Sequence, residues 1–300
     1  MSTSLAHCVD LHIHSTASDG TDSSATIVEM AVKLGLAAIA LTDHDSVAGV
    51  PEAVRKGKEL GLEVIGGCEF GVETPYGEMH IVSLWPDLRH RGLEALIEGQ
   101  NICRQERNLE MLEKLNKLGF SLSLQEVEAE ASSGGGLASL GRPHIALAMQ
   151  KKGYVQSVPE AFARYLSLGG KAFAPRRLLT PQAMLRELKN VGATTIIAHP
   201  LALGAPFDWL EELAGALGQQ GLLDGLEAFH PEHDAGKTTK VLELAARHNL
   251  LVSGGSDYHG AVKPGIALGR GYGGLKVAEV YLHKMKERRV QQGLPLDISP

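Results

Sequence analysis

The sequence predicts an α/β barrel that carries a small helical insert. Apolar, strand-like runs alternate with helical patterns, which is typical of βαβ units and a parallel sheet. Histidines and carboxylates follow the carboxyl ends of these runs, where α/β barrels place their functional groups. The interval between residues 80 and 199 is too long for one crossover, so it predicts an insertion.

Short apolar runs predict the strands of the barrel. They cover residues 9–14, 37–42, 63–69, 79–85, 194–199, 225–230 and 250–255. The patterns between them predict helices over 25–34, 51–60 and 236–248. The first two helices are expected to end at Gly35 and Gly61, because glycine readily takes the left-handed conformation of a helix end. Seven strands that alternate with helices indicate a barrel.

The chain is expected to divide into a discontinuous barrel, residues 1–100 and 170–290, and a helical insert, residues 101–169, that contributes to substrate binding. The helix that begins at Thr180 and Pro181 leads directly into the strand at 194–199, so it belongs to the barrel.

Within the insert, a row of leucines predicts one face of a helix that ends at Gly119. These are Leu109, Leu112, Leu115 and Leu118. Pro143 begins a second helix, and Ser157 with Glu160 forms the capping box of a third. The polar, glycine-rich stretch 132–136 predicts a flexible loop.

Composition indicates an ordinary globular protein of 300 residues, with 44% hydrophobic and 21% charged residues. Residues 1–9 lack the pattern of a signal peptide, and no run reaches the ~18 apolar residues of a membrane span, so we expect a cytoplasmic protein without membrane contact. The net charge of −6 argues against binding of long duplex nucleic acid and leaves room for a local basic pocket. No obligate protein partner is indicated.

Candidate metal ligands stand at or after the strand-like runs. His12 and His14 lie two residues apart and therefore point to the same side of a strand, where they can converge on one cation. The other candidates are Asp19, His44, Glu69, His80, His199, Asp257 and His259. Imidazoles and carboxylates gathered in this way are the ligands of a multinuclear site for Mn, Zn or Fe. The sequence therefore predicts a metal-dependent hydrolase.

Four motifs resemble those of the PHP family, named for polymerase and histidinol phosphatase. They are Asp10-Leu11-His12-Ile13-His14, Thr42-Asp43-His44, Ala198-His199-Pro200 and Ser256-Asp257-Tyr258-His259. The resemblance implies a metal-dependent phosphoesterase on a distorted seven-stranded β/α barrel. Residues 141–144 and 170–175 resemble the branch that contains AMP phosphatases and 3′,5′-nucleoside bisphosphate phosphatases, whose members are also linked to trimming of short oligoribonucleotides.

The resemblance implies three metal positions. The first would be held by His12, His14, Glu69 and Asp257, the second by Asp19, His44 and His259, and the third by Glu69, His80 and His199. Some relatives have histidine where this chain has Asp19, and the harder ligand favours Mn. We expect two to three divalent ions, with Mn²⁺ first and Zn²⁺ or Fe²⁺ as alternatives. Asp10 and Asp43 are expected to support ligand imidazoles from outside.

Basic residues of the insert and the following segment are expected to bind substrate. Arg142 and His144 flank Pro143 at a helix start, which attracts anions, so they are expected to bind a phosphate. Lys171, Arg176 and Arg177 form a basic stretch for a second phosphate or the nucleotide. His230 ends a strand without a metal partner and is expected to contact phosphate or to protonate the leaving group. The histidines outside strand ends, His7, His90, His233, His248 and His283, are expected to be structural or at the surface.

The predicted activity is hydrolysis of nucleotide phosphates, with a 3′,5′-bisphosphate such as adenosine 3′,5′-bisphosphate preferred, AMP next, and 5′-3′ trimming of short RNA as a related activity. Arg142 and the metals would stabilise charge, and His230 would act as acid. The alternatives are a histidinol phosphatase, a non-catalytic metal-binding or nucleotide-binding module, and an amidohydrolase-like enzyme acting on C–N bonds. The last often has a lysine where Glu69 stands.

Overall fold

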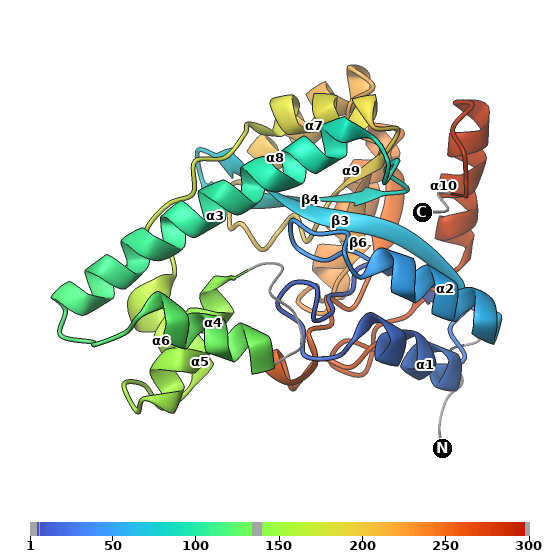
Figure 1. Cartoon of the computed structure of the whole chain (residues 1–300). Coiled ribbons are helices and arrows are strands. Elements are labelled where there is room, and N and C mark those ends of the chain that lie inside the picture. Colours follow the sequence, from blue (N-terminus) through green and yellow to red (C-terminus); the bar gives the residue numbers. More distant parts are fainter. Residues whose placement is uncertain (1–4, 6, 134–139, 298–300) are drawn as a thin grey trace.

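The computed structural model describes residues 5, 7–133 and 140–297. Within this part of the chain, eight strands form one sheet that curves into a nearly closed barrel, with helices on its outer face (Figure 1). The strands are β1 (Cys8–Asp10), β2 (Ala38–Leu41), β3 (Glu63–Thr74), β4 (Gly77–Leu84), β5 (Thr194–Ile197), β6 (Gly225–Phe229), β7 (Leu251–Gly254) and β8 (Val277–Ala278). The predicted α/β barrel is confirmed, and the short β8 is an addition to the seven expected strands.

Strand β4 runs opposite to both of its neighbours. The sheet order is β7-β6-β5-β4-β3-β2-β1-β8, and β3–β4, β4–β5 and β1–β8 are its antiparallel pairs. The expected parallel direction is wrong for β4, because only Pro75 and Tyr76 separate the paired residues Thr74 and Gly77. A turn of two residues joins antiparallel strands, whereas parallel strands need a long crossover. The first half of β4, with His80, therefore lies at the edge where the parallel strands end.

Two extended segments, residues 11–14 after β1 and 254–258 around the end of β7, close the barrel; we call them the closing segments. Backbone N–H groups of Leu11, Asp257 and His14 donate to the carbonyl oxygens of Gly254, His12 and Tyr258, at 3.1, 2.9 and 2.9 Å. A Cβ atom at Gly255 would lie only 2.4 Å from Cβ of His12, so glycine is needed for this approach. The second half of the predicted strand 9–14 is thus a bridge rather than a regular strand.

Helices connect the strands and cover the barrel, and residues 101–169 hold further helices. They are α1 (Ser24–Leu34), α2 (Val50–Leu60), α3 (Arg91–Lys117), α4 (Leu124–Ser133), α5 (Arg142–Lys151), α6 (Val158–Ala161), α7 (Pro181–Asn190), α8 (Phe207–Gln219), α9 (Ala235–Arg247) and α10 (Val280–Gln291), with a π-helical turn at Phe162–Leu166 and a 3₁₀ turn at Gly260–Val262. Gly35 and Gly61 end α1 and α2 with φ of 75° each, as predicted. Thr180 caps α7 through the N–H of Ala183.

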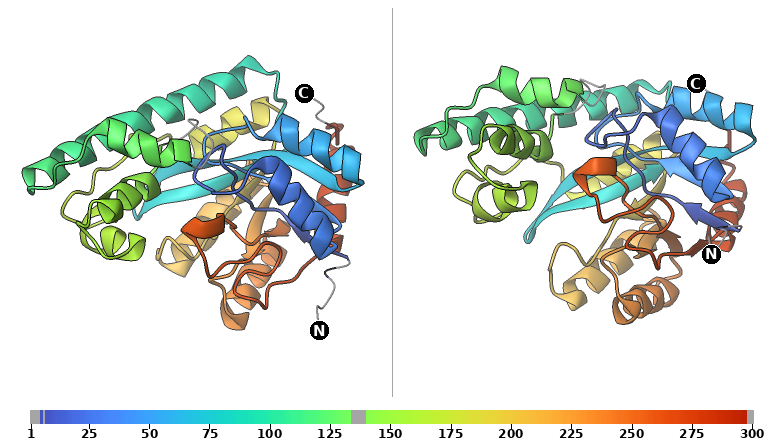
Figure 2. Two further views of the ribbon diagram at one scale, coloured as in Figure 1. Left: turned by 60° about the horizontal axis from the view of Figure 1, so that its bottom comes forward. Right: turned by 90° about the horizontal axis from the view of Figure 1, so that it is seen from below.

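Helix α3 extends from the barrel to the insert. Near its start, Leu93 packs in a barrel cluster, while Met111, Leu112 and Leu115 near its end join the core of the insert. Figures 1 and 2 show α4, α5 and α6 gathered at the far end of α3, beside the barrel. The insert therefore has an apolar core of its own. Its expected start at residue 101 falls inside α3, and the boundaries remain a prediction.

The leucine row expected on α3 is only half buried. Leu112 and Leu115 are buried, whereas Leu109 and Leu118 are 52% and 45% exposed. A step of three residues rotates a position back by about 60° on a helix of 3.6 residues per turn, so the ends of a long row leave the buried face.

Of the predicted flexible loop at 132–136, Ser132 and Ser133 belong to α4 instead, and residues 134–136 lie outside the described residues. None of the helices among the described residues is both long and apolar enough to cross a membrane.

Candidate metal centre

All nine predicted ligand residues come together at one edge of the barrel. Their ligand atoms form overlapping groups, in each of which the atoms lie within 4.8 Å of one another. The groups are His14, Asp19, His44 and His259; His12, His14 and Asp257; His12, Glu69 and His199; and His44, Glu69 and His80. The closing segments supply His12, His14 and Asp257, and the remaining residues follow β1, β2, β5 and β7 or lie within β3 and β4.

Glu69 occupies the middle of this cluster. Its side chain is 1% exposed, and Oε1 lies 3.0 Å from Nδ1 of His80 and 3.0 Å from Nε2 of His199. The other oxygen, Oε2, lies 3.0 Å from Nδ1 of His44 and 3.3 Å from Nε2 of His14. Burial alone would raise the pKa of the Glu69 carboxyl, but the surrounding imidazoles hold it well below its usual value. A carboxylate placed in this way can bridge neighbouring cations.

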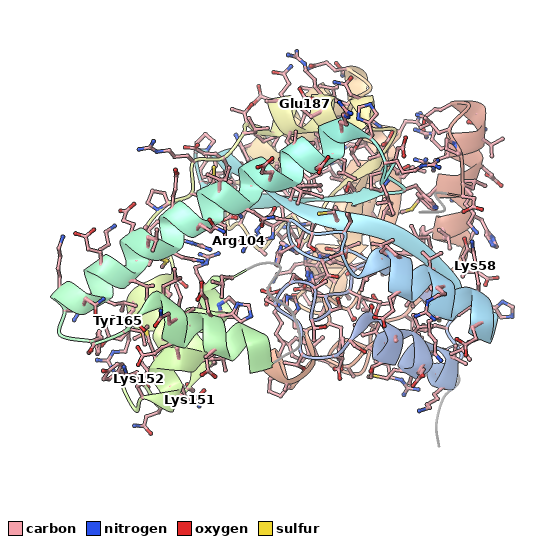
Figure 3. All side chains as sticks on the ribbon, viewed as in Figure 1. Lys58, Arg104, Lys151, Lys152, Tyr165 and Glu187 are labelled. Atoms are coloured by element: carbon pink, nitrogen blue, oxygen red, sulfur yellow. The ribbon has the colours of Figure 1, made fainter. Side chains whose placement is uncertain are left out.

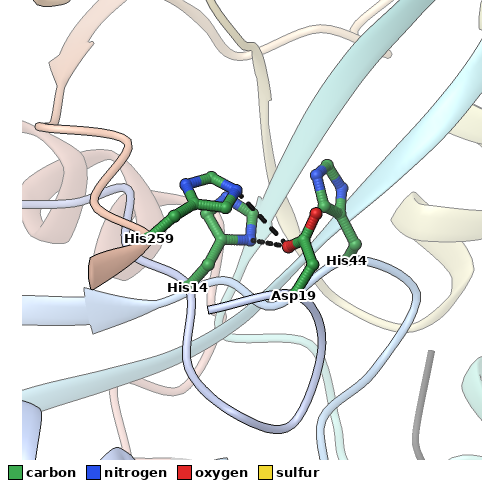
Figure 4. Close-up of side chains that lie close together, drawn as sticks. All are labelled: His14, Asp19, His44 and His259. Atoms are coloured by element: carbon green, nitrogen blue, oxygen red, sulfur yellow. Dashed lines mark ion pairs between the residues drawn. The ribbon is translucent and has the colours of Figure 1, made fainter. Parts of the chain in front are cut away.

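Asp19 is the centre of the group drawn in Figure 4. Its Oδ1 lies 3.3 Å from Nε2 of His259 and 3.9 Å from Nδ1 of His14. The rings of His14 and His259 stack at 4.1 Å between centroids, and His44 completes the group. The family resemblance implied a metal position held by Asp19, His44 and His259. In the structure, His14 belongs to the same group of potential ligands. The third implied set is divided, since His80 and His199 share Glu69 but lie in different groups.

Several buried polar atoms of the cluster make no hydrogen bond, although other polar atoms lie near them. They are both ring nitrogens of His14, Nε2 of His12, Oδ1 of Asp19 and Oε2 of Glu69. Buried polar groups are nearly always paired, so several unpaired atoms that face one space require an explanation. A divalent cation satisfies them, and imidazole with carboxylate is a donor set that suits Mn, Zn or Fe. The residues therefore fit the metals that the sequence implies.

Protons occupy part of the cluster when cations do not. Against the effect of burial, Glu69 and Glu78 raise the pKa of His80 to about 10. Likewise, Asp257 and Glu69 raise the pKa of His14 to about 9. Since metal ligands must be deprotonated, metal binding at this site releases protons.

Glu227, in β6, supports the cluster from behind and was not foreseen. Its Oε1 lies 3.0 Å from Nδ1 of His12, and its Oε2 accepts the backbone N–H of His199 at 2.6 Å. A neutral His12 that donates from Nδ1 presents the lone pair of Nε2 to the cluster. A charged residue in the middle of the apolar strand Gly225–Phe229 was the signal that could have revealed it.

Asp10 and Asp43 were expected to support ligand imidazoles, but their carboxylates bond to serine groups instead. Asp10 accepts from the N–H and hydroxyl of Ser256 at 2.8 and 2.6 Å, and Asp43 accepts from the hydroxyls of Ser15 and Ser18 at 2.7 and 2.6 Å. Both carboxylates face away from the cluster, as strand alternation predicts, and there they meet the polar groups of neighbouring loops. They fix the loops that carry the ligands.

His230 borders the cluster from the end of β6. It is 4% exposed, its Nδ1 accepts the N–H of Glu232 at 3.2 Å, and its unbonded Nε2 lies 3.6 Å from Oδ2 of Asp257. Because Nδ1 accepts a hydrogen bond, the neutral ring carries its proton on Nε2, which points to the cluster as a donor. Lys263, which the sequence analysis missed, lies 2.5 Å from the same oxygen of Asp257.

A cavity of about 360 Å³ lies next to the cluster; we call it the arginine pocket. Arg107, Arg142, Arg176 and Glu78 line it, and Oε1 of Glu78 lies 3.6 Å from Nε2 of His80. Burial, together with nearby guanidinium groups, lowers the pKa of Arg107 well below its usual value, and the Nη2 atom of this residue has no partner. Concentrated positive charge with an unpaired donor favours an anion here.

The predicted substrate residues have different positions. Arg142 lines the pocket and lies 3.9 Å from Glu78. Arg176 also lines it but is buried and paired with Asp45 and Glu78, at 3.0 Å each. Lys171 and Arg177 are exposed and do not line this pocket.

His144 is buried, and its Nδ1 accepts the N–H of Gly141, which closes the start of α5. That start lies close to the cluster, since a Cβ at Gly141 would be 3.9 Å from Oδ2 of Asp19. Arg104, labelled in Figure 3, donates to Asp45 through Nε at 3.0 Å. The sequence analysis identified neither Arg104 nor Arg107. Their three-residue spacing on one helix was the available signal.

Comparison with known proteins agrees with this geometry. Residues 10–172 match the PHP domain. The chain is 34% identical over 254 residues to a 5′-3′ exoribonuclease of Haemophilus influenzae, covering 83% of this chain and 89% of that protein. It is 31% identical to a phosphoribosyl 1,2-cyclic phosphate 1,2-diphosphodiesterase of Eggerthella lenta, covering 84% and 94%. It is 27% identical to a 3′,5′-nucleoside bisphosphate phosphatase of Chromobacterium violaceum, covering 84% and 87%.

A crystal structure from Bifidobacterium adolescentis, described as a candidate metal-dependent phosphoesterase, superposes with a TM-score of 0.83 at 30% identity, covering 93% of this chain and 96% of that one. The barrel and its clustered imidazoles and carboxylates define the class of metal-dependent phosphoesterases. The chain belongs to the PHP family. The resemblance seen in the four sequence motifs is thus confirmed.

Proposed function

We propose that the protein is a nucleotide phosphoesterase whose preferred substrate is a nucleoside 3′,5′-bisphosphate, with short 5′-phosphorylated RNA as a related substrate. The observation that carries this proposal is the arginine pocket beside the candidate metal centre. One phosphate of the substrate lies at the metals, and the other lies among Arg107 and Arg142. Two anion sites match a doubly phosphorylated ligand better than a plain monophosphate.

The metal centre is proposed to hold two to three Mn²⁺ ions, with Zn²⁺ or Fe²⁺ as alternatives. The proposed ligands are His12, His14, Asp19, His44, Glu69, His80, His199, Asp257 and His259. When bound, such ions lower the pKa of coordinated water and neutralise charge on phosphoryl oxygens.

Side chains around the metals orient the reaction. Glu227 fixes the ring of His12, so that Nε2 faces the cluster. His230 directs Nε2–H toward the same space, where it donates to a phosphoryl oxygen or protonates the leaving oxygen. Arg142, at the start of α5, neutralises charge on the bound nucleotide. The insert residues 101–169 thereby select the substrate, while the barrel performs the chemistry.

The similar proteins support this choice of substrate. Relatives that span most of the chain are named as an exoribonuclease and a 3′,5′-nucleoside bisphosphate phosphatase, and both act on nucleotides. Histidinol phosphate offers one phosphate and gives the arginine pocket no anion to bind. A non-catalytic module would not need the complete ligand cluster. In place of the bridging lysine of many amidohydrolases, Glu69 occupies the middle of the cluster.

One panel of substrates tests the proposal. kcat/KM is measured with Mn²⁺ for adenosine 3′,5′-bisphosphate, AMP, a short 5′-phosphorylated RNA, histidinol phosphate and phosphoribosyl 1,2-cyclic phosphate. We expect the bisphosphate to be best. If histidinol phosphate or the cyclic phosphate exceeds it by more than about tenfold, a preference of ~1.4 kcal/mol, the proposal is wrong. Metal analysis of gently purified protein, with less than one transition-metal ion per active chain, would refute the metal assignment.

A further inference from the structure

A second cavity borders the candidate metal centre at a different place from the arginine pocket. It measures about 550 Å³ and lies between the end of β6, the start of α9 and the residues before β8; we call it the His230 cavity. Its lining includes His230, His233, Thr238, Tyr272 and Lys276. This volume is within the range of about 300–1,000 Å³ that small-molecule sites occupy.

The His230 cavity is connected to the cluster through His230 itself. His230 is one of the lining residues, and its unbonded Nε2 lies 3.6 Å from Oδ2 of Asp257. The arginine pocket instead reaches the cluster at His80, through Glu78. His80 and Asp257 share none of the ligand groups formed by the described residues. The two cavities therefore adjoin the metal centre at different ends.

The lining of the His230 cavity suits a nucleotide. Tyr272 is 65% exposed and offers a ring for stacking on a base, and Lys276, also exposed, offers a cation for a phosphate. His233 bonds the carbonyl oxygen of Ala228 through Nδ1 at 2.9 Å, which leaves its buried Nε2 without a partner. His233 and Thr238 both line the cavity and are residue types that can bind a ribose through hydrogen bonds.

A 3′,5′-bisphosphate occupies the metal centre and the arginine pocket and leaves the His230 cavity without a role. In RNA, the scissile phosphate carries a second ester bond, to the nucleotide that follows. We infer that the His230 cavity binds this following nucleotide of a short 5′-phosphorylated RNA. The inference rests on the proposed function, and it explains how one centre can act on both a bisphosphate and an RNA chain.

The reaction is the same for both substrates. Water adds to the scissile phosphorus, the bond from phosphorus to the 3′-oxygen of the first nucleoside breaks, and that oxygen takes a proton. With the bisphosphate, the products are a nucleoside 5′-phosphate and inorganic phosphate. With RNA, the products are a nucleoside 5′-phosphate and a shortened RNA that keeps the phosphate at its new 5′ end. The His230 cavity contacts the substrate only in the second case.

Two exposed residues allow a test that leaves the core intact. In Tyr272→Ala and Lys276→Ala, kcat/KM is measured for a 5′-phosphorylated RNA of four nucleotides and for adenosine 3′,5′-bisphosphate. Stacking on Tyr272 and the phosphate contact of Lys276 would each contribute to binding of the RNA but not of the bisphosphate. We therefore expect the ratio of RNA to bisphosphate activity to fall by about tenfold in each variant. Lys284→Ala removes an exposed lysine from α10, away from this cavity, and should leave the ratio unchanged.

The outcomes separate this inference from the proposed function. If the parent hydrolyses neither substrate, the proposed function fails. If it hydrolyses the bisphosphate but not the RNA, or if the ratio stays within about twofold of the parent in both variants, a difference of ~0.4 kcal/mol, the His230 cavity is not an RNA subsite. Anisotropy of the labelled RNA with chelator present gives a second measure, because Tyr272→Ala should weaken binding without any turnover.

Discussion

Replacing Glu227 by glutamine tests how the candidate metal centre is held together. The carboxylate makes two bonds from inside β6, one with Nδ1 of His12 at 3.0 Å and one with the backbone N–H of His199 at 2.6 Å. When His12 binds a cation through Nε2, both partners are N–H donors. Glutamine has the same shape but only one acceptor oxygen, so its NH₂ group must face one of the two donors.

The expected cost is set by the loss of one hydrogen bond to a charged, buried acceptor. Such bonds contribute about 1.5–3 kcal/mol, which corresponds to roughly 10–150-fold in an equilibrium constant. Outer partners of metal-binding histidines show losses of the same size, about 10–100-fold. We therefore expect the Mn²⁺ affinity of Glu227→Gln to fall by about 10–100-fold, and kcat/KM to recover in part when Mn²⁺ is raised.

The assay is competition between the protein and a fluorescent chelator for Mn²⁺, with kcat/KM measured over the same metal range. Glu211→Gln is the matched control, because Glu211 pairs with Arg247 on the outer face of the barrel. It should bind Mn²⁺ as the parent does. If Glu227→Gln binds Mn²⁺ within about threefold of the parent, a difference of ~0.7 kcal/mol, then Glu227 does not orient a metal ligand.

Four further substitutions probe the proposed ligands, the arginine pocket and the junction with the insert. His14→Ala and Asp257→Ala should abolish turnover, and activity within about tenfold of the parent in a bisphosphate assay, ~1.4 kcal/mol, would contradict their role as ligands. Arg142→Ala should lower kcat/KM for nucleotides by an amount that corresponds to about 2 kcal/mol or more, and much less for an aryl phosphate. Equal losses on both substrates would show that the insert does not contact the nucleotide. Asp45→Asn should lower the free energy of unfolding by about 3–5 kcal/mol, because it leaves the buried Arg104 without its carboxylate, and urea titration should detect it. Burial would raise the pKa of Asp45, but Arg104 and Arg176 lower it below its usual value. The Asp45 carboxylate therefore stabilises the folded protein above the pKa of the unfolded chain, and this stabilisation is lost as the pH falls through the lower pKa of the folded protein. If Asp45→Asn loses stability in acid as steeply as the parent does, this reasoning is wrong.

Most residues of the cluster could be predicted because they lie in short local motifs. His12 and His14 share a side by strand periodicity, and the barrel brings strand ends together whatever the exact lengths of the strands. Glu69 and His80 have no motif of their own and were identified because apolar runs end on them, in agreement with the family resemblance. The direction of β4 depends on the two-residue turn at Pro75 and Tyr76, which a pattern of apolar runs does not resolve.

The arginine pocket shows what sequence patterns leave out. Arg142 was expected from its place beside a helix-starting proline, which is a local signal. Arg107 faces the same space from α3, and Arg176 reaches it from the segment before α7, so their meeting depends on packing between distant elements. For the same reason, the sequence did not indicate that Arg176 is neutralised by Asp45 and Glu78.

The closing segments make the candidate metal centre part of the barrel wall. The backbone bonds from Asp257 to His12 and from His14 to Tyr258 join the segments after β1 and β7, and the side chains of His12, His14 and Asp257 belong to the ligand groups. An ion bound there would connect the two closing segments, and its binding free energy would add to the stability of the folded protein. The backbone bonds of the closing segments form without an ion, so metal binding should stabilise a barrel that is already closed, and slower amide hydrogen exchange at His14 and Asp257 should report occupancy without a substrate.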